Sequence, residues 1–329
     1  MKGALIIDKC SQSSYYVKDK IAYFLGGEKE YNHPNHLGGK YAPPFMNFPY
    51  IFDEGYLLKI EEFGDISNMP DLDLDVIILS LEKSDYRVKD IRSKYPNAVI
   101  LATLKEYNPS GGHPTKTWND RLINLYNEVD IATSPYFKLD RFSEFQSLIN
   151  KDLIYLPDPI DIDFLSQNVF QEERPNTVLC YLAPTHMDRG QSETIQFCNY
   201  LQQRYGVELV IPKYSWPYDH NKRLPFNTFI EYIANASFCI NLDKWYQIGQ
   251  TGLHCAALGT IHIGGVADSN LKLFEETATN DLEKLGSIFE NLYTNHQERI
   301  HYIQTVYNRA YNNYSLDSVK KQLIKILEQ

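Results

Sequence analysis

The sequence predicts an α/β protein built from two Rossmann-like domains, and three observations carry this prediction. The chain has 329 residues, more than one hydrophobic core usually organises. Apolar runs of strand length alternate with amphipathic helical stretches in both halves. A polar, poorly periodic stretch at 167–176 separates the two series. We therefore expect a domain boundary near residue 170.

The first half contains four compact apolar or β-branched runs, each separated from the next by polar stretches. Runs that are buried on both faces are typical of a parallel sheet covered by crossover helices. A Gly-, Pro- and Asn-rich stretch at 26–50 predicts a loop long enough to have a function. The expected strands are 4–8, 75–80, 98–104 and 129–134, and the expected helices are 84–96 and 117–129.

The second half repeats the strand-helix alternation after a strand at 153–165 that ends in a Pro-Asp-Pro turn. The last segment is helical in pattern and is broken at Asn312–Tyr314, where Ser315 is a candidate N-cap for the final helix. The expected strands of this half are 177–183, 208–212, 238–242 and 260–265.

Composition limits the classes of function. The net charge of −10 and a pI near 5.4 argue against a general affinity for nucleic acid or anionic membranes. The apolar runs are too short to span a membrane, and the N-terminus lacks the pattern of a secretory signal. Five scattered cysteines without a CxxC spacing argue against disulfides and structural zinc. We expect a cytoplasmic protein with no metal site.

The most informative stretch is 238–265, which reads as a strand, a Gly-bearing loop, an Ala-rich helix and a strand that ends in a double Gly. Backbone N–H groups at a helix N-terminus lie at the positive end of the helix dipole, about half an elementary charge, and suit phosphate. Glycine lets the ligand approach the backbone, and Thr251 can cap the helix. The predicted phosphate cradle is Gly249, Gln250, Thr251 and Gly252.

Four segments resemble the GT-B-fold glycosyltransferases that use nucleotide sugars, in particular the donor domain of the retaining group 1, or family 4-like, enzymes. These segments are YLPDPIDIDFL, LPFNTFIEYIANASFCINL, GQTGLHCAALGTIHIGG and NRAYNNYSLDSVKKQLIKIL. The family's E-x7-E motif is degraded, because Tyr246 and His254 stand at its two Glu positions, and Ile261 replaces a usual Pro. The resemblance implies two Rossmann-like domains, 1–170 and 171–305, that face each other across a cleft, and a C-terminal helix, 306–329, that returns to the first.

The resemblance also implies roles for residues of the second domain. His254 would reach the ribose or a phosphate, with a purely structural role in the helix as the alternative. Arg189, whose planar guanidinium keeps its charge, would face the diphosphate. The remaining candidates are Arg223 and Leu224, whose backbone atoms would bracket the base, and Asp243 and Lys244, which follow a strand at the sheet edge where ligands collect.

The acceptor is expected in the first domain. Glycosyl transfer with inversion requires a general base near the acceptor hydroxyl, and either outcome requires stabilisation of charge at the anomeric centre. Glu106 and His113 follow the strand 98–104 and are the candidate catalytic residues, with structural loop residues as the alternative. Gly111 and Gly112 make the same loop a candidate lid.

These observations predict a metal-independent glycosyltransferase of the hexosyltransferase type. It would move a sugar from a UDP- or GDP-linked donor, used as co-substrate without a further cofactor, to a hydroxyl of a glycan, a lipid-linked acceptor, a protein or a modified nucleobase. The alternative is a non-catalytic nucleotide- or sugar-binding protein of the same fold, which Tyr246 and His254 favour. A Rossmann-type oxidoreductase is disfavoured, since no GxGxxG follows the first strand of either half. Net acidity disfavours a DNA-modifying transferase.

Overall fold

The chain folds into two compact α/β units. The computed structural model describes residues 1–7, 21–25, 44–80, 88–104, 120–169, 176–182, 189–212 and 226–329. Unit 1 comprises Met1–Ile160 and Leu316–Gln329, and unit 2 comprises Asp161–Ser315. We describe each unit by itself.

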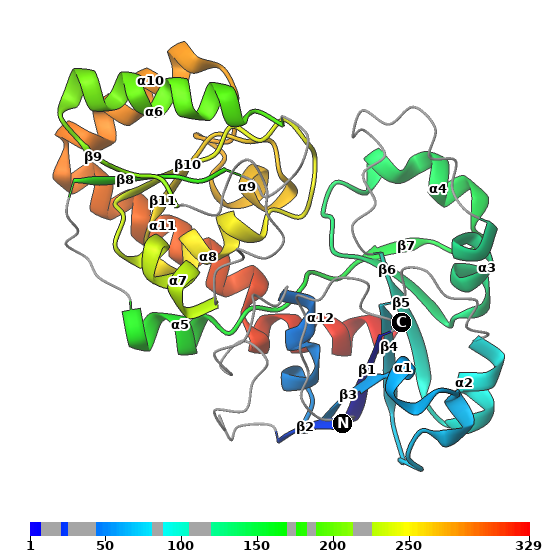
Figure 1. Cartoon of the computed structure of the whole chain (residues 1–329). Helices are drawn as coiled ribbons and strands as arrows, with labels where there is room; N and C mark the ends of the chain where they lie inside the picture. The colour runs from blue at the N-terminus through cyan, green and yellow to red at the C-terminus, as the bar shows by residue number, and fades with distance from the viewer. Residues whose placement is uncertain are drawn as a thin grey trace. The chain divides into compact units, whose positions relative to one another are not determined.

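Unit 1 contains a seven-stranded sheet in the order β2-β3-β1-β4-β5-β6-β7 (Figure 1). Every neighbouring pair is parallel except β2 and β3, which are antiparallel at one edge. The predicted strands appear as β1, β4, β5 and β6, whereas β2 and β3 were not predicted. The strands are β1 (Lys2–Ile7), β2 (Ile21–Leu25), β3 (Glu54–Lys59), β4 (Val76–Ser80), β5 (Val99–Thr103), β6 (Ile131–Ser134) and β7 (Leu153–Tyr155).

Short helices connect these strands. Part of the segment expected as a loop at 26–50 is a 3-10 helix, η1, which packs so closely on β3 that a Cβ at Gly55 would lie 1.8 Å from the Pro49 carbonyl oxygen. Glycine at this position therefore permits the contact between the two elements. The helices of unit 1 are η1 (Pro44–Ile51), α1 (Ile60–Phe63), η2 (Ile66–Asn68), α2 (Val88–Lys94), α3 (Asp120–Glu128), η3 (Leu139–Phe142), α4 (Ser143–Leu148) and α12 (Leu316–Leu327).

The C-terminal helix α12 packs on unit 1, as predicted. Its apolar stripe, Val319, Leu323 and Ile326, joins the core cluster formed by β1, β3, β4 and η1. At its polar margin, Lys320 Nζ lies 2.6 Å from Asp53 Oδ1, and Gln322 Nε2 donates to the Tyr155 carbonyl oxygen at 2.6 Å. Residues 306–315, which were expected to belong with this helix, instead complete α11 of unit 2.

Unit 2 contains a four-stranded parallel sheet in the order β11-β10-β8-β9. Helices α6 and α10 cover one face, and α7 and α8 lie on the other (Figure 1). The strands are β8 (Thr177–Cys180), β9 (Glu208–Val210), β10 (Phe238–Ile240) and β11 (Ile261–Ile263). The helices are α5 (Ile162–Val169), α6 (Gln191–Tyr205), α7 (Phe226–Ala234), α8 (Gln250–Leu258), α9 (Asp268–Leu273), α10 (Leu282–Thr294) and α11 (His296–Tyr314).

Two boundaries differ from the expected ones because helices, rather than polar composition, determine them. α5 contacts α8 and belongs to unit 2, so the division falls at 160 instead of 170. The expected break at Asn312–Tyr314 is shifted, since α11 continues through Tyr314 and Ser315 follows in an extended conformation.

Gly286 lies within α10, and a Cβ there would meet no atom within 4 Å. We expect Gly286→Ala to stabilise unit 2 by about 0.5–1 kcal/mol, because alanine loses less backbone entropy than glycine in a helix. Urea unfolding followed by circular dichroism measures this gain. An unchanged or lower midpoint would contradict the open environment of this glycine.

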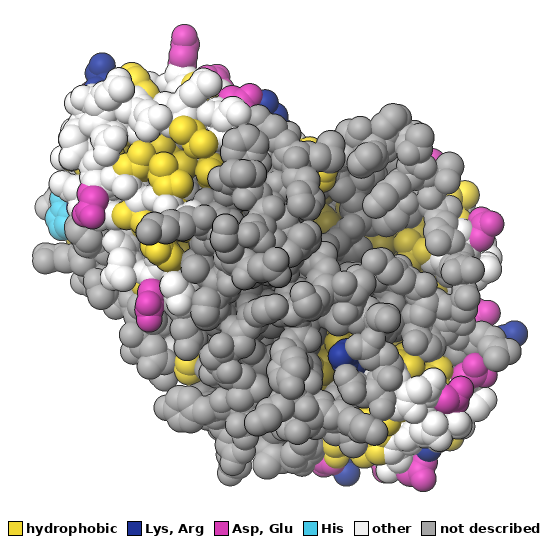
Figure 2. Space-filling view, in the orientation of Figure 1, with side chains coloured by type: hydrophobic (Ala, Val, Ile, Leu, Met, Phe, Trp, Pro, Cys, Tyr) yellow, Lys and Arg dark blue, Asp and Glu magenta, His cyan; other side chains and the backbone are white. Residues whose placement is uncertain are grey.

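The surface of the described residues shows no gathering of positive charge on the face in Figure 2, where Lys and Arg side chains stand singly among Asp and Glu. No helix in the described part of the chain is long and apolar enough to cross a membrane.

Candidate functional site

The loop between β10 and α8 ends at the N-terminus of α8. Gly249 occupies the N-cap with φ 85° and ψ 50°, and no described side chain caps the helix. Thr251, which was expected as the cap, lies instead inside the first turn, because the left-handed backbone at this point is accessible to glycine and strained for threonine. The first-turn N–H groups therefore have no intrahelical acceptor and stand at the positive end of the helix dipole.

Two glycines of the predicted cradle are required by the packing of α9. A Cβ at Gly249 would lie 2.4 Å from Ser269 Oγ, and a Cβ at Gly252 would lie 2.0 Å from Asn270 Oδ1. Ser269 Oγ also donates to the Gly249 carbonyl oxygen at 2.6 Å. α9 thus fixes the conformation of the α8 N-terminus, a role that the sequence pattern did not indicate.

The double Gly that follows β11 makes a second close approach. Gly264 and Gly265 have φ values of 90° and 75°, and Cβ atoms there would lie 3.0 and 2.9 Å from the Asn241 carbonyl oxygen. Gly265 N donates to Asn280 Oδ1 at 3.0 Å, and Asn270 Nδ2 lies 3.4 Å from the Gly264 carbonyl oxygen. The loops after β10 and β11 are therefore packed directly on each other.

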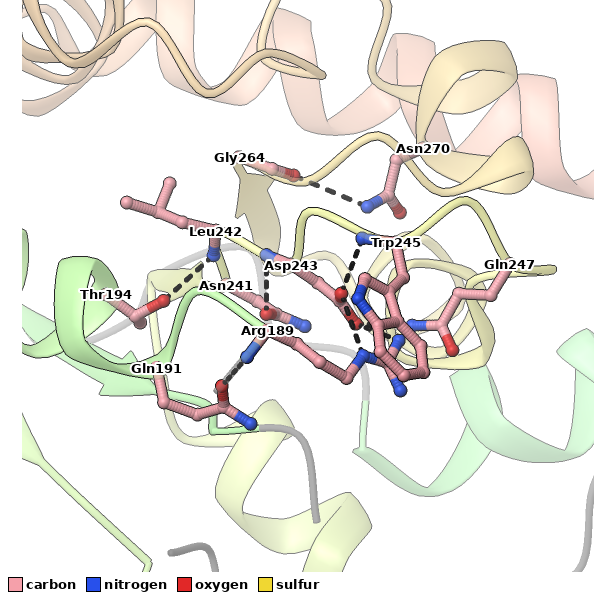
Figure 3. A network of polar contacts seen from close by, with 10 residues as sticks. All are labelled: Arg189, Gln191, Thr194, Asn241, Leu242, Asp243, Trp245, Gln247, Gly264 and Asn270. Atoms are coloured by element: carbon pink, nitrogen blue, oxygen red, sulfur yellow. Dashed lines mark hydrogen bonds and ion pairs between the residues drawn. The ribbon is translucent and has the colours of Figure 1, made fainter. Parts of the chain in front are cut away.

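Arg189 and Asp243 form a paired group beside this loop (Figure 3). Arg189 Nε donates to Asp243 Oδ1 at 3.1 Å, and Nη2 donates to Oδ2. The guanidinium therefore binds the carboxylate through two parallel hydrogen bonds. The carboxylate also accepts from Trp245 N at 2.9 Å and from Gln247 Nε2 at 2.7 Å. The Arg189 Cζ atom lies 4.3 Å from the centre of the Trp245 ring.

Burial makes this ion pair energetically important. The side chains of Arg189 and Asp243 are 13% and 3% exposed. Burial raises the pKa of Asp243, and the nearby Arg189 charge opposes the rise. Removing the guanidinium would leave a buried carboxylate without its counter-ion, which typically costs about 3–5 kcal/mol.

Lys244 lies next to the paired group but is turned toward α6. Its Nζ forms an ion pair with Glu193, and its backbone N donates to the Arg189 carbonyl oxygen at 2.8 Å. Lys244 is exposed, and this pair lies on the surface, where ion pairs contribute little to stability.

Tyr181, which follows β8, is hydrogen-bonded with Thr251 in the first turn of α8. Burial raises the pKa of Tyr181 to about 12, and a hydrogen bond with the Thr251 side chain opposes the rise. The charges of Asp243 and Arg189 also act on this phenol. The phenol therefore links the segment after β8 to the first turn of α8, and the charges of the Arg189–Asp243 pair act on it. The sequence analysis missed this residue because Tyr181 was interpreted only as part of a strand.

Tyr246 is fully buried rather than directed toward a ligand. Its hydroxyl donates to Asp268 Oδ1, and Asp268 is itself 1% exposed. The carboxylate that pairs with Tyr246 thus comes from α9, at a buried position. Asp268 also anchors the loop, since its backbone N donates to the Gln247 carbonyl oxygen at 2.7 Å.

His254 is also buried, with 2% of its surface exposed. Its Nδ1 lies 2.8 Å from the Gln250 carbonyl oxygen, and its ring meets the Phe229 ring edge to face at 5.7 Å between centres. Burial lowers the pKa of His254 to about 4. The side chain packs between α8 and α7, so the structural alternative has direct contacts to support it, and a contact with the ribose stays a prediction.

Four predicted site residues lie outside the described residues: Glu106, His113, Arg223 and Leu224. Among the residues that the structure describes, no group of three or more His, Cys, Asp or Glu side chains is arranged to hold a metal ion.

No protein-family model matches the chain, and no curated protein matches it. The structure is similar to an alpha-glucosyltransferase (AGT) in complex with UDP, with 11% identity, a TM-score of 0.56, and 83% of this chain and 86% of that chain covered. The chain has the GT-B fold. A TarM mutant from S. aureus in complex with Fondaparinux, alpha-GlcNAc-glycerol and UDP matches at 7% identity and a TM-score of 0.56, covering 80% of this chain and 58% of that one.

A third similar structure is the N-terminal domain of trehalose-6-phosphate phosphatase from Candida albicans. It has 12% identity and a TM-score of 0.57, over 78% of this chain and 70% of that one. At these identities the likeness concerns the fold. The narrower resemblance to family 4-like enzymes, with its degraded E-x7-E motif, stays a prediction.

Proposed function

We propose that this protein is a glycosyltransferase that binds a nucleotide sugar in unit 2 and transfers the sugar to an acceptor hydroxyl. The observation that carries the proposal is the α8 N-terminus, whose first turn has no side-chain cap among the described residues and follows the loop that holds Asp243, the ion-pair partner of Arg189. The α8 N-terminus and Arg189 both lie at the carboxyl ends of β8 and β10 in a parallel sheet, where ligands of open α/β sheets bind. The similar AGT and TarM structures contain UDP, which supports a UDP-linked donor.

The chemistry follows from the charge that develops on the leaving diphosphate. Backbone N–H groups of Gln250, Thr251 and Gly252 would bind the phosphate oxygens, and Arg189 would supply a cation. A helix dipole together with one guanidinium provides this neutralisation without a divalent ion, so the transferase is proposed to be metal-independent. Glu106 and His113 stay the proposed catalytic residues on the acceptor side.

The donor site does not determine the class of acceptor. One AGT complex contains a 13-mer DNA with an HMU base, and the TarM complex contains alpha-GlcNAc-glycerol. A modified nucleobase and a glycan or lipid-linked hydroxyl are thus both within the proposal. A net charge of −10 favours the second group, because DNA binding depends mainly on Lys and Arg.

The second candidate function is a non-catalytic nucleotide- or sugar-binding protein. The burial of Tyr246 and His254 favours it, since both positions of the E-x7-E motif are used for packing. The two candidates share donor binding and differ in turnover.

A nucleotide panel tests the proposal. We expect UDP, GDP or their sugars, at 100 times the dissociation constant, to stabilise unit 2 by about 2.7 kcal/mol, which corresponds to a rise in the Tm of this unit of roughly 5–10 °C. CDP and ADP serve as comparisons, and each nucleotide is measured with and without EDTA. A panel without any shift would contradict both candidate functions. Binding without release of UDP or GDP from the sugar nucleotide, with or without acceptors, would select the non-catalytic protein.

A further inference from the structure

We infer that Asp243 and Trp245 are positioning residues, which hold the Arg189 guanidinium in one orientation and thereby set the affinity of unit 2 for the diphosphate of a nucleotide. This inference rests on the proposed function. It assigns to Asp243 a role through Arg189, where the sequence indicated direct contact with a ligand.

The guanidinium is held on one edge and on one face. Asp243 accepts from Nε and Nη2, and the Trp245 ring lies against the plane at 4.3 Å from Cζ (Figure 3). Arginine has five N–H donors, and the two bonds to Asp243 use two of them. The other three make no hydrogen bond to the described residues, and the Nη1 edge is the one that we infer receives the anion.

The carboxylate is itself fixed, which makes it a rigid support. Trp245 N and Gln247 Nε2 donate to its two oxygens, and Asp243 N donates to Asn241 Oδ1 at 3.1 Å. With 3% exposure, Asp243 has no direct access to a ligand in solution. A change at Asp243 can therefore affect binding mainly by releasing Arg189.

The Arg189–Asp243 pair and the predicted phosphate cradle share one loop, because Gln247, which donates to the Asp243 carboxylate, lies two residues before the N-cap Gly249. The phenol of Tyr181 is hydrogen-bonded with the side chain of Thr251 in the first turn of α8, and the charges of Asp243 and Arg189 influence its pKa. A diphosphate at the α8 N-terminus would therefore lie beside the guanidinium. A guanidinium that is already held in one orientation loses less conformational entropy on binding than a mobile one. This difference is the physical basis of the expected gain in affinity for the diphosphate.

The test compares a charged ligand with its uncharged parent. Dissociation constants are measured for UDP and uridine, and for GDP and guanosine, by calorimetry or ligand-observed NMR. We expect Arg189→Ala to weaken binding of the diphosphate about 10- to 100-fold, as loss of a charged hydrogen bond typically does, while the nucleoside changes less than about 2-fold. Asp243→Asn keeps the shape but presents an NH2 group to a donor, and we expect about a 10-fold loss for the diphosphate alone.

The decisive measurement is the double variant. If Asp243 acts through Arg189, Asp243→Asn weakens diphosphate binding no further in the Arg189→Ala background. Additive losses, or equal losses for nucleoside and diphosphate, would overturn the inference and leave the proposed function standing. A wild-type protein that binds neither UDP nor GDP would overturn both. If Asp243→Asn does not fold, Trp245→Leu takes its place, with an expected loss of about 3- to 10-fold for the diphosphate alone.

The matched control is Glu290→Gln. Glu290 forms an exposed ion pair with Arg204 at 3.6 Å, within unit 2 and outside the proposed site. Like Asp243→Asn, this substitution changes one carboxylate to an amide. We expect the dissociation constants for the diphosphate and for the nucleoside to stay within about 2-fold of the wild type. A loss in this variant equal to that of Asp243→Asn would attribute the effect to net charge and overturn the positioning role.

Discussion

Replacing Gly190 with alanine is expected to destabilise unit 2 by roughly 2–6 kcal/mol and to abolish nucleotide binding. Gly190 has φ 115°, a conformation that costs other residues about 1–3 kcal/mol. A Cβ there would also lie 2.1 Å from the Leu242 carbonyl oxygen, a backbone atom that no side-chain rotation can displace. Moving a packed backbone apart adds a further cost of about 1–3 kcal/mol.

The same contact explains the effect on binding. Thr194 Oγ1 donates to the Gly190 carbonyl oxygen at 2.7 Å and accepts from Leu242 N at 3.0 Å, so one threonine joins the start of α6 to the end of β10. Any separation of these segments moves Arg189 away from Asp243, since each residue adjoins the contact. We therefore expect the loss of binding to exceed the loss that stability alone would produce.

Gly206 provides the matched control at the other end of α6. It also has a left-handed backbone, with φ 67°, but a Cβ there would meet nothing within 4 Å. We expect Gly206→Ala to cost only about 1–2 kcal/mol, the strain of the conformation itself, and to leave binding unchanged. Hydrogen exchange of α6 and β10 peptides measures both variants. Equal protection in the two would show that the contact with Leu242 has no energetic weight.

The strands of unit 2 could be predicted because each is a short apolar run between helical patterns, and β8, β10 and β11 begin within three residues of their expected positions. β3 could not, because it starts and ends on charged residues, Glu54 and Lys59, and its apolar part is too short to stand out. β2 was missed although Ile21, Tyr23 and Phe24 favour a strand, because among the described strands it pairs only with β3, which was not expected.

Part of the candidate site could be predicted because it is local in the sequence. The Gly-rich turn before α8 is local and visible in the sequence, whereas the Arg189–Asp243 pair joins residues 54 positions apart and depends on the fold. The roles of Tyr246 and His254 were open to two interpretations, because only burial distinguishes a core residue from a ligand-binding one. Asn270 and Asp268 were missed, since the contribution of α9 arises from packing against glycines.

Lowering the pH is expected to destabilise unit 2 strongly between about pH 6.5 and 4. Burial lowers the pKa of His254 and of His262 from 6.5 to about 4. In this window the unfolded chain binds a proton at each histidine and the folded chain does not, so stability falls as pH falls. A shift of this size corresponds to about 3 kcal/mol for each residue, fully present above pH 6.5 and lost by pH 4.

His262 offers the sharper test, because neither of its ring nitrogens has a hydrogen-bond partner among the described residues, and its ring lies 5.7 Å from that of Phe274. We expect His262→Leu to raise stability at pH 7 by about 1–3 kcal/mol, since it removes an unsatisfied buried polar group. It should also reduce proton uptake on unfolding at pH 5 by about one proton, measured as the slope of unfolding free energy against pH. His301→Gln, at an exposed position on α11, controls for the substitution of a histidine. If His262→Leu has the wild-type slope of unfolding free energy against pH, His262 is protonated in the folded protein. If the variant is less stable than the wild type at pH 7, the ring nitrogens have hydrogen-bond partners that leucine cannot replace.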